Sequence, residues 1–97
     1  MKFCDIGKIE LTPSGELFVY PAFADKSLFE YVYRAAKGVY WDGGKTYFYM
    51  KQFGDWSPAE VFQNILLAVK DELGVELLVR PNTQWQGLEQ KTVGGSI

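Results

Sequence analysis

Residues 56–75 carry a complete set of helix signals and constrain the fold more than any other stretch. Ser57 and Glu60 have the spacing of a capping box, in which each side chain accepts a hydrogen bond from the other residue's backbone N–H. Pro58 takes the first helical position, where its missing N–H costs nothing, and Gly74 offers a left-handed residue that can end the helix. The apolar residues between these signals recur at helical spacing and are Phe62, Ile65, Leu66, Val69 and Leu73. A helix with one apolar stripe must cover another element, so we expect the rest of the chain to supply a sheet.

A hairpin and a second helix are predicted in the first part of the chain. Residues 8–11 and 16–20 alternate between apolar and polar side chains, and the turn segment 12–15 between them contains proline and glycine. A helix should then begin near Asp25 or Ser27, with Ser27 and Glu30 as a second possible capping box, and end at Gly38. Its apolar face would be formed by Leu28, Val32, Ala35, Ala36 and Val39.

A second hairpin and a later strand complete the predicted sheet. Residues 39–41 and 45–51 are rich in aromatic and β-branched side chains and flank an Asp-Gly-Gly turn, which is a strong hairpin signal. Residues 76–80 form the last long strand, and one more short strand is expected around residues 85–88. These elements predict a single α+β domain over residues 1–89, followed by a flexible tail over residues 90–97.

The order of these elements is strand, strand, helix, strand, strand, helix, strand. Without its first strand, this is the βαββαβ order of ferredoxin-like folds. We therefore predict a two-layer sandwich in which both helices cover one face of a mainly antiparallel sheet, preceded by an extra N-terminal strand. Many unrelated functions share that fold, so the prediction says little about activity.

Composition removes several classes of function. The 97 residues include no histidine, which excludes His metal ligands and Ser-His or Cys-His catalytic pairs. Cys4 is the only cysteine, so no disulfide can form within the chain, and the net charge of −2 does not indicate a nucleic-acid partner. No apolar run is long enough to span a bilayer and no signal peptide is evident, so a cytoplasmic protein is expected. The sequence predicts neither a metal site nor a cofactor.

The outer side of the main helix offers one apolar residue and one misleading motif. Leu67 lies about 140° from Phe62 on a helical wheel, so we expect it to be exposed or to contact another chain. Residues 70–75 resemble the end of the Nudix hydrolase box. Leu67 and Ala68, however, stand where that box has its arginine and an essential glutamate, so the sequence does not predict Nudix activity.

Aromatic residues make up 16% of the chain and concentrate on the predicted strands. Because side chains alternate along a strand, one face of the sheet should carry Phe18, Tyr20, Tyr47 and Tyr49, with Tyr40 or Trp41 alongside. We take Tyr40 as the fifth member of this face. Residues 17–20 and 45–50 resemble in position the two short motifs of RNA recognition motif proteins, in which outward aromatics stack on bases. They lack the glycines of the longer motif, and only Lys45 and Lys51 lie near to contact phosphates.

These observations favour a small non-enzymatic binding or interaction module that self-associates through an aromatic sheet face. A large exposed apolar surface rarely stays bare, and residues 1–11, the segment around Trp85 or a second copy of the chain could cover it. One alternative is a ligand-binding or enzymatic domain whose aromatic pocket would use Arg34, Asp42 or Arg80. The other is single-stranded nucleic-acid binding through the sheet aromatics.

Overall fold

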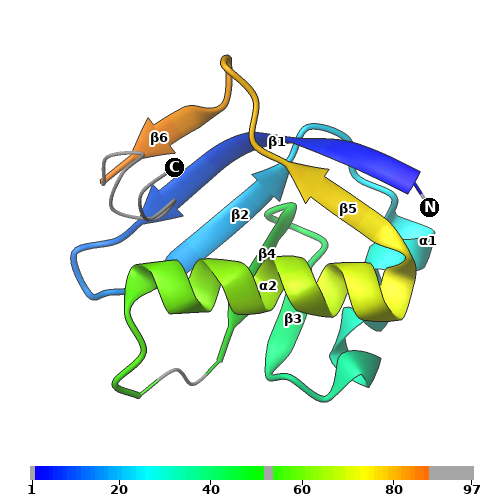
Figure 1. Ribbon diagram of the computed structural model, residues 1–97, viewed down its shortest axis with the longest axis horizontal. Coiled ribbons are helices and arrows are strands. Elements are labelled where there is room, and N and C mark those ends of the chain that lie inside the picture. Colours follow the sequence, from blue (N-terminus) through cyan, green and yellow to red (C-terminus); the bar gives the residue numbers. More distant parts are fainter. Residues whose placement is uncertain (1, 52–53, 88–97) are drawn as a thin grey trace.

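The computed structural model describes residues 2–51 and 54–87 and shows a mixed, mainly antiparallel sheet with helices on one face (Figure 1). The sheet order is β3-β4-β2-β1-β5, and β6 also pairs with β1. The elements in chain order are β1 (Lys2–Leu11), β2 (Leu17–Pro21), α1 (Lys26–Phe29), the 3₁₀ helix η1 (Glu30–Ala35), β3 (Val39–Asp42), β4 (Tyr47–Met50), α2 (Pro58–Leu73), β5 (Val75–Leu78) and β6 (Gln84–Gln86). The predicted α+β class and the two hairpins are confirmed.

The ferredoxin-like arrangement is not confirmed, because the extra strand takes a central place in the sheet. β1 lies between β2 and β5, pairing antiparallel with the former and parallel with the latter. β2 and β4 are antiparallel neighbours. The predicted strand order along the chain is correct, but the sheet that these strands form has a different topology.

A β-bulge explains why β1 contributes buried side chains to the core on both sides of Gly7. The pairing register with β2 shifts between Ile6 and Lys8, so that Gly7 is an extra residue on β1. Ile6 and Ile9 are three positions apart and would point to opposite faces of a regular strand. With the bulge between them, both side chains are buried in the core.

Helix α2 forms as its sequence predicts. The backbone N–H of Ser57 donates to Glu60 Oε1 at 2.8 Å, and the N–H of Glu60 donates to Ser57 Oγ at 3.2 Å. Gly74 ends the helix with a φ of 66°. The residues of α2 that are buried against the sheet are Val61, Phe62, Ile65, Ala68 and Val69, whereas Leu66 and Leu73 are only half-buried. Leu67 is 44% exposed, which confirms the predicted phase of the helix.

The first helix is shorter and tighter than predicted. A single α-helical turn, α1, is followed by the 3₁₀ helix η1, and Ala36 ends it with a φ of 57°. The predicted Ser27–Glu30 capping box is absent, because the Ser27 hydroxyl donates to Asp25 Oδ1 at 2.8 Å instead. Phe29 and Val32 are buried, but Ala36 is exposed and Val39 belongs to β3, so the predicted five-residue face does not form.

The turn between β3 and β4 is wider than the predicted Asp-Gly-Gly turn. The Thr46 N–H donates to the Asp42 carbonyl at 2.7 Å, and Thr46 itself adopts a φ of 63°. The strand therefore begins at Tyr47 rather than at Lys45. The last long strand runs over Val75–Leu78 instead of 76–80, and the short strand is centred on Trp85. Residues 88–97, which include the predicted tail, lie outside the described residues.

Candidate functional site

Five aromatic side chains form a continuous cluster on the face of the sheet opposite α2. We call this cluster the aromatic face; its members are Phe18, Tyr20, Tyr40, Tyr47 and Tyr49. The Phe18 and Tyr47 rings stack with centroids 4.2 Å apart, and Tyr20 contacts Tyr47 edge-on at 5.3 Å. Tyr49 continues the cluster to Tyr47 at 5.8 Å and to Tyr40 at 6.0 Å. The structure therefore brings together all five residues that strand alternation predicts.

In the part of the chain that the structure describes, the backbone of neither segment predicted as an intramolecular cover lies over the aromatic face. Residues 2–11 form β1 within the sheet, and Trp85 packs against the buried core that α2 covers. Trp41, the other aromatic residue considered for this face, also points to the core side, with its ring 4.8 Å from that of Phe48. The five rings are half-buried, through contact with one another and with the strands that carry them.

Polar groups contact the rings at both ends of the cluster. Lys8 Nζ lies 4.3 Å from the centroid of the Tyr20 ring, and Lys51 Nζ lies 4.9 Å from that of Tyr40. The Tyr20 hydroxyl donates to Glu10 Oε1 at 2.9 Å. Burial and this hydrogen bond raise the pKa of Tyr20 to about 12. Tyr20 is therefore uncharged at neutral pH, and the cations of Lys8 and Lys51 lie against the two outer rings of the aromatic face.

Within residues 2–51 and 54–87, the three polar residues predicted for a pocket each contact a different part of the fold. Arg34 lies on η1 with its guanidinium 4.4 Å from the ring of Tyr31. Asp42 Oδ1 accepts hydrogen bonds from the N–H groups of Gly44 and Lys45, both at 3.0 Å, and so stabilises the hairpin turn. Arg80 Nε donates to Asp5 Oδ1 at 2.9 Å. None of the three lines either hollow described below.

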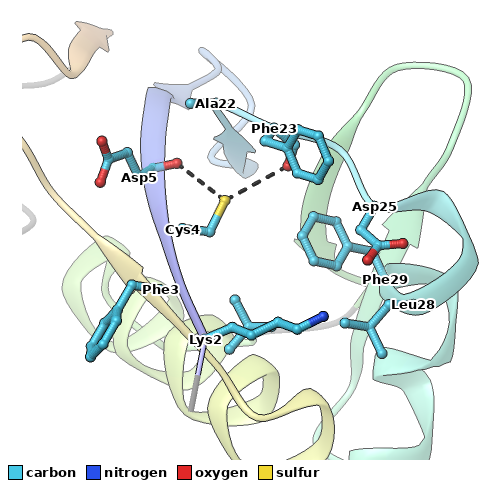
Figure 2. A pocket seen from close by; sticks show the side chains of 10 residues that line it. Lys2, Phe3, Cys4, Asp5, Ala22, Phe23, Asp25, Leu28 and Phe29 are labelled. Atoms are coloured by element: carbon cyan, nitrogen blue, oxygen red, sulfur yellow. Dashed lines mark hydrogen bonds between the residues drawn. The ribbon is translucent and has the colours of Figure 1, made fainter.

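A cavity of about 530 Å³ that the sequence did not predict opens beside the first half of β1 (Figure 2). It exists because β2 ends at Pro21, whereas β1 continues alone on that edge toward Lys2. The chain after β2 bends away and returns through α1, leaving a hollow between β1 and α1. We call this hollow the Cys4 cavity; its apolar walls come from Ala22, Phe23, Leu28, Phe29 and Val75.

Because side chains alternate along a strand, successive residues of β1 at this cavity point to opposite sides of the strand. Figure 2 shows the Lys2 and Cys4 side chains on the cavity side of β1 and the Phe3 and Asp5 side chains on the other side. The thiol of Cys4 lies 3.6 Å from the carbonyl oxygen of Asp5 and 3.7 Å from that of Phe23. Burial raises the pKa of Cys4, which keeps it a neutral thiol rather than a reactive thiolate.

A second, smaller hollow lies on the outer side of α2. This groove of about 250 Å³ is lined by Leu67 and its neighbours on α2 together with Glu76 and Leu77 of β5. In the described part of the chain, no group of three or more His, Cys, Asp or Glu side chains could hold a metal ion. Among the same residues, no helix is both long enough and apolar enough to cross a membrane.

Comparison with known proteins places the chain in a family. The sequence model of the integron cassette protein Hfx_Cass5 matches residues 4–83. The chain belongs to that family. A solved structure titled "Structure from the mobile metagenome of North West Arm Sewage Outfall: Integron Cassette Protein Hfx_Cass5" is 30% identical, with 94% of this chain and 88% of that chain covered and a TM-score of 0.47. No curated protein matches the chain.

Proposed function

We propose that this member of the Hfx_Cass5 family is a small interaction module that self-associates through the aromatic face. The observation that carries the proposal is the unbroken contact of five aromatic rings on the side of the sheet opposite α2. Tyrosine is enriched at protein interfaces, because it combines a large apolar ring with a hydroxyl that can remain hydrogen-bonded. Large apolar patches on soluble proteins are typical of contact surfaces.

The chemistry of the aromatic face supports a second copy of the chain as the partner. A two-fold interface brings the same surface together twice, so it must not place like charges at its centre. The five side chains are uncharged, and the raised pKa values of Tyr20 and Tyr47 keep their phenols neutral well above neutral pH. Lys8, Lys51 and Glu10 at the margin offer charges of both signs for a polar rim.

The ring contacts favour a protein partner over a nucleic acid. Bases stack on exposed aromatic ring faces. Phe18 and Tyr47 cover one face of each other, and the cations of Lys8 and Lys51 lie over Tyr20 and Tyr40. Ring edges and hydroxyls suit packing against another protein surface better than stacking on bases.

The test compares the solution mass of two charged variants by sedimentation equilibrium. Tyr49→Glu places a carboxylate in the middle of the aromatic face, and we expect it to convert a concentration-dependent dimer to a monomer, because the charge would be buried without a partner. Tyr33→Glu is the matched control, because Tyr33 is 50% exposed on η1 and lies outside the cluster. It should associate as the wild type does. Circular dichroism would verify that both variants fold.

Two results would contradict the proposal. The first is a wild-type chain that remains monomeric at every accessible concentration. The second is a Tyr49→Glu variant with the same association constant as the Tyr33→Glu variant. Salt-sensitive binding of mixed-sequence RNA that is lost in Tyr49→Glu, together with a monomeric wild type, would favour the nucleic-acid alternative instead.

A further inference from the structure

We propose that the Cys4 cavity binds a small organic anion that has an aromatic or branched apolar body and a carboxylate held by Lys2. The cavity lies on the helix side of the sheet, where Phe29 packs on Phe48, and is therefore separate from the aromatic face. Its volume of about 530 Å³ falls within the roughly 300–1,000 Å³ typical of pockets for small molecules.

The apolar walls of the cavity fit a compact hydrophobic body. Phe29 is buried and anchored to the core by Trp41 and Phe48, at centroid distances of 5.2 and 5.0 Å, so it provides a rigid floor. Phe23 is 69% exposed, the largest exposure among the large apolar side chains of the described residues. It stands at the rim of the cavity in Figure 2. A bound apolar ring would remove the exposed Phe23 surface from water.

The charges around the cavity select an anion. Lys2 extends along the cavity toward Leu28 in Figure 2, and among the described residues no carboxylate lies within ion-pair distance of it. Two acidic residues also line the cavity, and in the described part of the chain only Asp5 is in an ion pair. Asp5 points to the other side of β1 and pairs with Arg80, and Asp25 accepts a hydrogen bond from Ser27 at the start of α1. Lys2 is the one cation among the described residues that line the cavity, so its ammonium group is the group that can pair with a ligand carboxylate.

The lone cysteine gives the cavity its own reporter. Cys4 is the single thiol of the chain and lines the cavity, so alkylation by iodoacetamide modifies only this position. The probe is 3-phenylpropionate, and its uncharged counterpart of the same shape is 3-phenylpropionamide. We expect 3-phenylpropionate to slow alkylation of Cys4 and to shift the backbone amide resonances of Cys4, Phe23 and Leu28 in NMR spectra.

Two lysine variants test the role of the charge. Lys2→Met keeps the apolar stem and removes the ammonium group, so the dissociation constant of 3-phenylpropionate should rise by about tenfold or more, to the value for the amide. Lys26→Met removes a nearby charge on α1 that does not line the cavity, and it should leave binding unchanged. Tyr49→Glu should also bind the probe as the wild type does, which separates this proposal from self-association.

Three outcomes would overturn the proposal. Equal binding of the acid and the amide would show that the cavity does not recognise an anion. Unchanged binding of the acid in Lys2→Met would remove Lys2 as its partner. Absence of resonance shifts at Cys4, Phe23 and Leu28 with either probe would exclude the cavity as a binding site, whatever the reactivity of the thiol.

Discussion

Both faces of the sheet carry aromatic side chains, but the two faces of β4 differ in how far those side chains are buried. On β4, Phe48 is fully buried beneath the helices, whereas its neighbours Tyr47 and Tyr49 point to the other face and are half-buried. Phe48 contacts Phe29 of α1 in the helical layer as well as Trp41 of the neighbouring strand β3. The aromatic contacts of Tyr47 among the described residues are all with rings of its own sheet. An aromatic side chain on the helix side therefore holds two layers together, and one on the outer side forms a surface. Stability and surface recognition are divided between alternate positions of one strand.

The largest effect that separates the two faces should come from removing the ring of Phe48. Phe48→Ala leaves a cavity at the centre of the core, and the free energy of unfolding should fall by about 3–5 kcal/mol. Tyr47→Ala removes a ring from the outer face and should cost markedly less. Urea unfolding at a concentration where the chain is monomeric measures both. Equal losses would show that the aromatic face stabilises the fold as strongly as the core does.

At alkaline pH, the aromatic face should show a contribution to the free energy of unfolding that is smaller than that of Phe48. The Tyr20 pKa of about 12 in the folded chain lies above its ordinary value of 10.0. Between these two values the unfolded chain loses the phenol proton while the folded chain keeps it. The stabilisation of the folded chain that comes from this difference in pKa is fully present below pH 10 and is lost as the pH rises toward 12.

Tyr20→Phe isolates this effect. The variant loses the hydrogen bond to Glu10, which should lower stability at neutral pH by about 1 kcal/mol. Its free energy of unfolding should then fall less steeply than that of the wild type between pH 10 and 12. Parallel curves for the two proteins over that range would contradict the raised pKa.

The smallest effect is expected on the outer side of α2, where Leu67 is exposed beside the groove at β5. Leu67→Glu removes no core contact, so the free energy of unfolding should change by no more than about 0.5 kcal/mol. Chemical denaturation measures this directly. A loss comparable with that of Phe48→Ala would show that Leu67 packs within the fold. A changed association constant would add the outer side of α2 to the interface.

Residues of the candidate site were predicted unequally well. Tyr47 and Tyr49 belong to a regular strand, where the period of two determines the face to which each side chain points. Asp42 was predicted as a pocket group, but a carboxylate next to two glycines is equally suited to accept turn N–H groups, and the structure shows that role. The Cys4 cavity was missed because Lys2 and Phe23 are far apart in the sequence and neither lies in a motif. Unequal lengths of β1 and β2 create the cavity, and no local pattern reports that difference.

The sequence by itself determined the elements whose signals are local. The capping box, the apolar stripe and Gly74 define α2 within a single stretch of chain, because helix hydrogen bonds and caps join residues only a few positions apart. Alternation likewise determined which aromatic residues share a face. Only the tertiary structure decided the place of β1, since strand pairing joins residues that are distant in the sequence. It also decided that residues 30–35 form a 3₁₀ helix, where packing of Phe29 and Val32 into the core outweighs weak local helix signals. The order of the sheet and the Cys4 cavity both follow from β1 lying between β2 and β5.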